Sequence, residues 1–241
     1  MNTQPIEKRR ESDAGTSLDV HSVFLTIQGE GPFTGHAAVF VRLAGCNLQC
    51  PLCDTDYTST RTATDIHDLA ALVHQTRHES ATNLVVITGG EPLRQNIFPF
   101  VTLLLSRGYR VQIETNGTLP LPDGMGEVCS TDTRRANACF IVVSPKTGKV
   151  HPTVELHACA FKYVMSYDSE DHDGLPINAL DHSATPRVAR PTPMWRGPIY
   201  LQPVDVDDID VNDAHLSACV QSCKRNGYIL QLQIHKLIGV E

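Results

Sequence analysis

Three cysteines stand close together in the stretch Gly45-Cys46-Asn47-Leu48-Gln49-Cys50-Pro51-Leu52-Cys53-Asp54-Thr55. Three residues separate the first cysteine from the second, and two separate the second from the third. Iron–sulfur clusters are bound by cysteine thiolates, normally one per iron. Three thiolates therefore suit three irons of a four-iron cluster and leave the fourth iron open to a ligand that is not protein.

The same spacing also fits a zinc knuckle that takes its fourth ligand from elsewhere in the chain, such as His36. A closed zinc site is structural, whereas a metal site with an open position is typical of catalysis. Spacing alone leaves both interpretations open, so the motifs that follow in the chain have to separate them.

Length and composition indicate a single globular domain. The chain has 241 residues, of which 41% are apolar and 20% charged, the usual balance for a protein with a buried core. Its formal net charge is -7, and its Lys and Arg residues form no basic stripe, which argues against nucleic acid as a partner. No apolar run approaches the roughly 18 residues of a membrane span. A small-molecule substrate is expected.

Residues 1–18 are polar and lack the apolar segment of a signal peptide, so they are expected to form a disordered leader. Residues 19–241 are then one domain, with insertions near residues 119–138 and 166–198. The chain contains eight cysteines, but their uneven spacing in a chain of this length argues against a disulfide framework. We therefore expect a reducing, cytoplasmic location.

Short apolar runs alternate with helical patterns. Strands are predicted at residues 20–27, 37–43, 84–87, 110–114, 140–143, 161–165, 199–202 and 228–235. Helices are predicted at residues 65–78, after Pro92, and at residues 212–226 with Gly227 as the cap. This order is typical of an α/β fold with a parallel sheet. Because there are too few helices for eight repeats, we predict an incomplete TIM-type barrel.

Most of the unusual motifs directly follow a predicted strand, which is the ligand-binding edge of parallel α/β folds. One of them is Thr88-Gly89-Gly90-Glu91-Pro92, about forty residues after the cysteines. Together with the cysteine stretch it resembles the radical S-adenosylmethionine superfamily. The resemblance implies a [4Fe-4S] cluster whose open iron binds S-adenosyl-L-methionine. It also implies a 5′-deoxyadenosyl radical that removes a hydrogen atom from the substrate.

A narrower resemblance extends over most of the chain. It is carried by Gln28-Gly29-Glu30-Gly31, Phe40-Val41-Arg42-Leu43-Ala44-Gly45-Cys46-Asn47-Leu48, Cys53-Asp54-Thr55, Glu114-Thr115-Asn116-Gly117, Ser144-Pro145-Lys146, Gln202-Pro203 and Gln233-Ile234-His235-Lys236. In this order the motifs are similar to those of the 7-carboxy-7-deazaguanine synthase family, which serves 7-deazapurine (queuosine) synthesis. The resemblance implies conversion of 6-carboxy-5,6,7,8-tetrahydropterin to 7-carboxy-7-deazaguanine with loss of ammonia. It further implies Mg²⁺, an electron donor such as flavodoxin or ferredoxin, and a homodimer.

The resemblance also implies roles for individual residues. The cluster ligands are Cys46, Cys50 and Cys53, and Thr55 is the Mg²⁺ ligand. Residues expected in the S-adenosylmethionine site are Leu52, Cys53, Asp54, Gly90, Ser144, Pro145, Lys146, Gln202, Pro203, Val204 and Asp205. Residues expected to contact the substrate are Ile27, Gln28, Gly29, Arg42, Thr88 and Glu241. Residues expected to act in catalysis are Glu30, Glu114 and His235. These residue types suit the chemistry, since a guanidinium can bind a carboxylate through two hydrogen bonds.

Two other interpretations stay open at this point, one as a different enzyme and one as a non-catalytic module. A glycyl-radical activating enzyme shares a short radical core but often carries extra cysteine sets, which this sequence lacks. A non-catalytic iron–sulfur or zinc module does not need the motif at residues 88–92. Cys219 and Cys223 fall on one face of the late predicted helix and are interpreted as packed thiols rather than a second cluster.

Overall fold

The computed structural model describes residues 2–78, 80–180 and 187–240. Its strands are β1 (Ser17–Ile27), β2 (Ala37–Leu43), β3 (Thr62–Asp65), β4 (Leu84–Gly89), β5 (Arg110–Thr115), β6 (Cys139–Val143), β7 (Ala158–Met165), β8 (Ile199–Pro203) and β9 (Ile229–Leu230). Its α-helices are α1 (Ile66–Thr76), α2 (Phe98–Ser106), α3 (Met125–Val128), α4 (Pro152–His157), α5 (Ile209–Asn226) and α6 (Ile234–Leu237). Two short 3₁₀ helices are η1 (Gly31–Phe33) and η2 (Pro92–Arg94).

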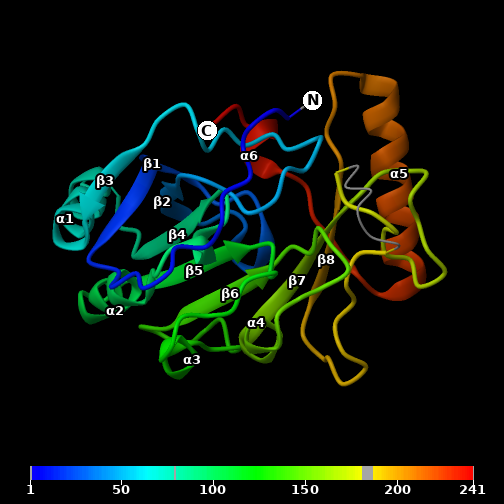
Figure 1. The fold of residues 1–241 in the computed structure, drawn as a ribbon. Helices are drawn as coiled ribbons and strands as arrows, with labels where there is room; N and C mark the ends of the chain where they lie inside the picture. Colours follow the sequence, from blue (N-terminus) through cyan, green and yellow to red (C-terminus); the bar gives the residue numbers. More distant parts are fainter. Residues whose placement is uncertain (1, 79, 181–186, 241) are drawn as a thin grey trace.

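In the described ranges nine strands form one open sheet, in the order β3-β1-β2-β4-β5-β6-β7-β8-β9 (Figure 1). From β2 to β9 every neighbouring pair is parallel, while β1 runs antiparallel to both β2 and β3. The two edge strands, β3 and β9, do not pair with each other. The predicted incomplete α/β barrel is therefore confirmed.

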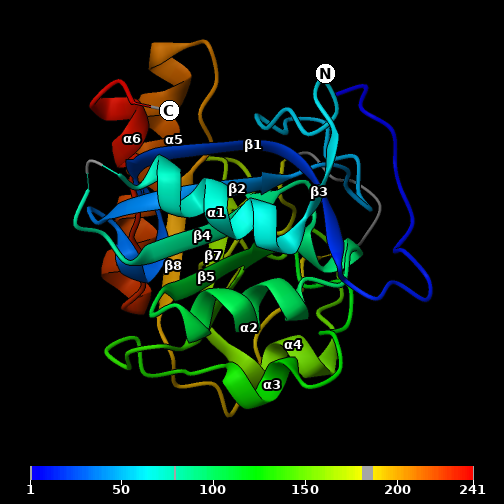
Figure 2. The same cartoon turned by 90° about the vertical axis from the view of Figure 1, so that its left-hand side faces the viewer.

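Capping residues mark the start of α1 and the end of α5. The Asp65 side chain accepts a hydrogen bond from the His67 backbone N–H at the start of α1, as a good N-cap does. Gly227 ends α5 in the left-handed conformation, with φ +74°, where glycine has no steric penalty. Helices α1 and α2 lie over the same face of the sheet (Figure 2), and α5 packs beside β8.

Alternate residues of each parallel strand face opposite sides of the sheet, and the two sides differ in chemistry. Val39 and Val41 of β2 belong to the large core under the helices. On the other face, Ala38 of β2 packs in a second, smaller core with Phe140 of β6. Toward the carboxyl ends of the strands this second face becomes polar, because Arg42 follows Ala38 and Phe40 at the same alternate spacing. A ligand site can form at the polar end of this second face, which we call the inner face.

At the corner after β4, two segments of the chain approach each other closely. Gly89 has φ +122°, and a Cβ at Gly89 would overlap the Leu43 carbonyl oxygen, while one at Gly90 would overlap that of Gly45. Their absence thus lets β4 pack against the end of β2, where the Gly90 N–H donates to the Leu43 oxygen at 3.2 Å.

Glu91 fixes this corner to the next strand, because its buried carboxylate accepts hydrogen bonds from Thr115 Oγ1 at 2.7 Å and from the Asn116 N–H at 2.8 Å. The helix expected directly after Pro92 is wrong at its start. Only η2 forms there, and α2 begins at Phe98.

The strand predicted at residues 228–235 is also wrong in extent, since β9 ends at Leu230 and α6 begins at Ile234. Gln231 continues the pairing by one hydrogen bond, from its N–H to the Leu201 oxygen. Its side chain then binds the loop after β1, accepting from the Gly31 N–H at 2.7 Å and donating to the Gly29 oxygen at 3.0 Å. These side-chain bonds turn the chain away from the edge of the sheet.

Residues 2–10, expected to be part of a disordered leader, lie against the cysteine loop in the structure and donate backbone hydrogen bonds to it. Their polar side chains, which indicated disorder, are engaged in contacts with that loop and with the corner after β4. The expected insertion at 166–198 contains residues 181–186, which lie outside the described residues. The division into one domain with two insertions stays a prediction.

No helix within residues 2–78, 80–180 and 187–240 is long and apolar enough to cross a membrane.

The corner after β4 yields a stability prediction. Gly89→Ala should lower the free energy of unfolding by about 3 kcal/mol, because a Cβ there adds an overlap with backbone to the strain of a positive φ. Gly35→Ala is the matched control, since Gly35 has φ +85° but no atom within 4 Å of the Cβ position. We expect it to cost only about 1–2 kcal/mol. Urea unfolding of the metal-free chain measures both, and equal losses would contradict the packing at Gly89.

Candidate functional site

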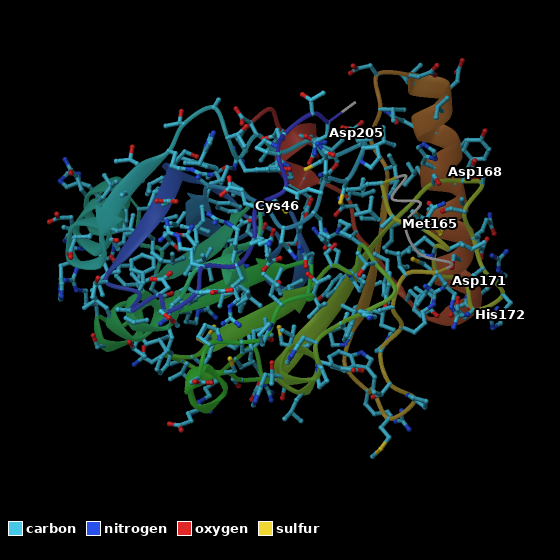
Figure 3. The ribbon with its side chains drawn as sticks, in the orientation of Figure 1. Cys46, Met165, Asp168, Asp171, His172 and Asp205 are labelled. Carbon is cyan, nitrogen blue, oxygen red and sulfur yellow. The ribbon has the colours of Figure 1, made fainter. Side chains whose placement is uncertain are left out.

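A cavity of about 390 Å³ opens at the carboxyl ends of the parallel strands. Its walls come from β2, β4, β5, β7 and β8, from the cysteine loop after β2, and from the segment 233–236. Cys46 and Asp205 both lie on this side of the sheet, whereas Asp168, Asp171 and His172 lie away from it beside α5 (Figure 3). His172 and Arg187 pair with Asp171 there, and Glu170 pairs with Arg225 of α5, so these described charges of the insertion are engaged away from the cavity.

Most of the residues predicted for the site do meet at this cavity. Those that line it are Ile27, Gln28, Glu30, Arg42, Cys46, Cys50, Leu52, Cys53, Asp54, Thr55, Thr88, Gly90, Glu114, Ser144, Lys146, Gln202, Pro203, Val204, Asp205 and His235. Pro145 is buried beside the lining rather than in it. Glu241 lies outside the described residues.

Gly29 supports the lining from behind. A Cβ at Gly29 would overlap the imidazole of His235, so this glycine lets the first residues of α6 pack directly against the loop after β1. His235 thereby reaches the cavity from the far end of the chain. The sequence motif around Gly29 and the one around His235 are thus two halves of one contact.

The three cysteines of the loop share this wall. All three are free thiols; Cys46 and Cys50 are buried and Cys53 is half-buried. In the part of the chain that the structure describes, no three His, Cys, Asp or Glu side chains lie close enough to hold one metal ion. His36 does not line the cavity and instead contacts the Phe33 oxygen at 2.9 Å through Nδ1. The fourth ligand considered for a zinc knuckle is thus hydrogen-bonded elsewhere.

The opposite wall provides polar groups for a ligand next to the cysteines. Gln202 is 4% exposed, and its Oε1 has no hydrogen-bond partner among the described residues. A buried acceptor without a partner costs about 1–3 kcal/mol, so a donor group of a bound ligand would stabilise it. Lys146 donates to Ser144 Oγ at 2.5 Å. These donors and acceptors fit the amino and carboxylate groups of an amino acid such as the methionine part of S-adenosylmethionine.

Three ionisable groups form the floor of the cavity. Lys162, from the middle of β7, makes a buried ion pair with Glu30, which follows β1. Glu114, at the end of β5, accepts hydrogen bonds from the amides of Gln28 and Gln112, each at 2.9 Å. The floor therefore contains two carboxyl groups and one ammonium group, supplied by three separate parts of the sheet.

Burial and charge act oppositely on these groups. Burial raises the pKa of Glu30, but the adjacent Lys162 ammonium outweighs it and holds the pKa below its usual value. The pKa of Glu114 is raised by burial and by the Glu30 charge, although Lys162 partly opposes this. Burial lowers the pKa of Lys162, yet Glu30 and Glu114 raise it overall. The geometry favours a charged Lys162–Glu30 pair. Beside it, Glu114 keeps its proton more readily than an ordinary exposed glutamate does.

A cation and aromatic rings line the side of the cavity nearest β1. The Arg42 guanidinium lies 5.2 Å from the ring centroid of Phe24, within the range of a cation–π contact. Phe24 and Phe40 stack with centroids 5.5 Å apart. Thr88, in register with Arg42 on the neighbouring strand, donates to Glu114 Oε2 at 3.5 Å. This side suits a flat, anionic ring system.

Lys236 closes the rim. Its ammonium group lies 3.1 Å from Asp54 Oδ2 and 2.8 Å from Asp205 Oδ2. It therefore joins the cysteine loop, the turn after β8 and the start of the C-terminal segment above the cavity.

Sequence reasoning gave no role to Lys162, Gln233 or Lys236, although the last two lie in a motif that carries the family resemblance. The sequence could have indicated Lys162, because a lysine inside an otherwise apolar strand needs a buried partner. Gln233 donates to Glu30 Oε1 at 2.9 Å, and nothing in its local sequence indicates this contact across 203 residues.

Comparison with known proteins agrees with the geometry. A family model, the Radical SAM superfamily, matches residues 41–131. The chain is 41% identical over 235 residues to the 7-carboxy-7-deazaguanine synthase of Rhodospirillum rubrum, with 94% of each chain covered. It is 35% identical over 241 residues to the protein of the same name from Rickettsia prowazekii, with 95% of this chain and 92% of the relative covered. The crystal structure of QueE from Escherichia coli matches with a TM-score of 0.65 and 26% identity, over 90% of this chain and 93% of that one.

The cysteine wall yields a second prediction. After anaerobic reconstitution with iron and sulfide, Cys50→Ala should bind much less iron than the unmodified chain and lose the four-iron absorption and EPR spectra. Cys219→Ala is the control, because Cys219 is buried on α5 and does not line the cavity, so it should keep both. An equal loss of iron in the two variants would remove the assignment of the cluster to the loop.

Proposed function

This chain belongs to the 7-carboxy-7-deazaguanine synthase family, and on that premise we propose that it converts 6-carboxy-5,6,7,8-tetrahydropterin to 7-carboxy-7-deazaguanine with loss of ammonia. The observation that carries the proposal is that three free cysteines and the ionisable groups of Glu30, Lys162 and Glu114 line a single cavity. A cavity of about 390 Å³ is in the usual size range for a small-molecule site.

Cys46, Cys50 and Cys53 would hold the [4Fe-4S] cluster. Bound together, the cluster and S-adenosylmethionine supply one-electron cleavage of the sulfonium and hydrogen-atom abstraction from the substrate. The residues proposed to hold S-adenosylmethionine lie on the cysteine loop and at the ends of β4, β6 and β8. They are Leu52, Cys53, Asp54, Gly90, Ser144, Lys146, Gln202, Pro203, Val204 and Asp205, with Pro145 behind them.

The floor and the aromatic side would bind the pterin. Arg42 would bind its carboxylate through two parallel hydrogen bonds. The charged Glu30 would accept hydrogen bonds from ring N–H groups, whereas a protonated Glu114 can donate one to a ring oxygen or nitrogen. His235 would approach from the segment above. Ile27, Gln28 and Thr88 complete the contacts, and Gly29 allows the approach of His235. Glu241 is proposed from the family resemblance alone.

Thr55 would provide an oxygen ligand for Mg²⁺; this is supported by its place in the cavity lining, with its hydroxyl 3.5 Å from Asp54 Oδ1. Magnesium usually keeps several waters and takes only one or two protein ligands together with substrate oxygens, so a single threonine is sufficient. The proposal also requires a reductant for the cluster, for which ferredoxin or flavodoxin is suitable, a reducing location such as the cytoplasm, and a second copy of the chain as a homodimer partner.

The activity is tested by anaerobic turnover of the reconstituted chain with 6-carboxytetrahydropterin, S-adenosylmethionine, Mg²⁺ and a chemical reductant. We expect the deazapurine chromophore of 7-carboxy-7-deazaguanine to appear, and to form more slowly when Mg²⁺ is omitted. Cys50→Ala is the negative control. Cleavage of S-adenosylmethionine without any deazapurine would contradict the proposed substrate, and an unchanged rate without Mg²⁺ would contradict the role of Thr55.

The buried ion pair gives a prediction for pH dependence. Glu30 has a lowered pKa because Lys162 outweighs burial, so a charged Glu30 is lost only as pH falls through that low value. In Lys162→Met the Gln233 hydrogen bond still lowers the pKa of Glu30, but burial, the largest cause, is no longer offset by the ammonium group, so the pKa rises. The acid limb of the kcat/KM profile should then move up by about 1 unit or more, which is about tenfold in rate on that limb.

Lys162→Arg is the matched control for this variant, because it keeps a cation beside Glu30. We expect its acid limb to stay closer to that of the unmodified enzyme. If the profile of Lys162→Met has the same acid limb and differs only in its plateau, Lys162 supports the fold and does not set the charge of Glu30.

A further inference from the structure

We infer that residues 2–7, which precede the first strand, are part of the cluster site and position the cysteine loop, with Gln4 as the central positioning residue. The inference rests on a cluster bound by the three cysteines and does not depend on the identity of the substrate. Figure 1 shows this N-terminal segment, drawn in dark blue, next to the loop between β2 and β3.

The cysteine loop lacks internal regular structure. Residues 44–61 are all described and contain no helix or strand, and their only β-bridge joins Cys46 to Ile6 of the N-terminal segment. Ordering the backbone of a free loop costs roughly 1–2 kcal/mol per residue. Contacts from outside the loop must therefore help to keep the three thiols in place before the cluster binds.

The N-terminal segment donates to the carbonyl groups of the cysteines themselves. The Glu7 N–H donates to the Cys46 oxygen at 2.7 Å. The Asn2 N–H donates to the Pro51 oxygen at 2.9 Å, and the Asn2 side-chain amide to the Cys50 oxygen at 3.1 Å. Two of the three predicted ligands thus have their backbone oxygens bound by this segment.

Gln4 fixes the loop after the third cysteine. Its Nε2 donates to the Thr55 oxygen at 2.9 Å, and its Oε1 accepts from the Tyr57 N–H at 2.8 Å. The Cys53 thiol contacts the same Thr55 oxygen at 3.8 Å. Because the Gly45 N–H donates to the Tyr57 oxygen at 2.9 Å, Gln4 lies where the two ends of the cysteine loop meet.

The segment is anchored at its other end. The Glu7 carboxylate lies 3.2 Å from Nη1 of Arg94 and also pairs with Arg61. Arg94 is 4% exposed, and its Nη2 donates to the oxygen of Ala44, the first residue of the loop, at 2.9 Å. The segment is therefore attached both to the cysteine loop and to the corner after β4 that contains Gly90.

Groups that hydrogen-bond to metal ligands and orient them, without touching the metal, typically contribute 10–100-fold to metal affinity. The test compares Gln4→Ala, Gln4→Glu and, as matched control, Thr3→Ala, whose side chain is exposed on the same segment. Hydrogen exchange at the Tyr57 amide is measured in the metal-free chain. The rate at which a reconstituted cluster is lost to an iron chelator is measured without oxygen, reductant or pterin.

We expect Gln4→Ala to speed both Tyr57 exchange and cluster loss, the latter by about 10-fold or more. Gln4→Glu keeps an acceptor for the Tyr57 amide but has no donor for Thr55, so Tyr57 should stay protected while cluster loss still accelerates. Thr3→Ala should match the unmodified chain in both measurements.

Unchanged cluster loss in Gln4→Ala would overturn the inference, since the segment would then only cover the loop. Unchanged Tyr57 exchange in that variant would overturn it too, because the contact would not hold in solution. So would equal acceleration in Thr3→Ala. Neither measurement involves the pterin, and a wrong substrate in the proposed function would leave both results unaffected.

Discussion

Two carboxyl groups and one ammonium group share the buried end of the sheet, and the balance of their charges determines how the site is built. Fully charged, Glu30, Glu114 and Lys162 would leave an excess negative charge in a place where an unpaired charge is costly. Lys162 and Glu30 neutralise each other as an ion pair, and the amides of Gln28 and Gln112 donate hydrogen bonds to Glu114. This group also joins β1, β5 and β7 across the sheet, so the charge balance and the positions of these strands depend on each other.

The polar floor follows from the two-residue period of the parallel strands. On the inner face some strands change from apolar to polar residues toward the cavity, as in β7, where Ala160 belongs to the small core and the next residue of that face, Lys162, reaches the cavity. The same change occurs from Val86 to Thr88 in β4. A single face thus supplies both the packing that holds the strands together and the groups that bind a ligand. Helices α1 and α2, which lie on the other face, leave that edge of the sheet open.

The sequence was sufficient for the α/β class, for most strands and for the family, because each of these depends on local patterns or on motifs contiguous in the chain. The matched relatives and the open sheet confirm these predictions. The errors lie where distant contacts override local pattern. Gln231 turns the chain off the sheet by binding the loop near Gly29, some 200 residues earlier. The composition of residues 2–10 likewise gives no sign of their hydrogen bonds to the cysteine loop. Roles of the individual site residues stay predictions, although most of them share one cavity.

The contact of Lys236 with Asp54 and Asp205 has a consequence for access to the cavity. All three side chains are between about a third and three-fifths exposed, and an exposed ion pair is worth only about 0.2–1 kcal/mol. The rim is therefore joined by bonds that thermal motion breaks often and that dissolved salt screens further. The buried pair on the floor is shielded from the same ions. Entry and exit of small molecules can thus respond to ionic strength while the charges that define the floor do not.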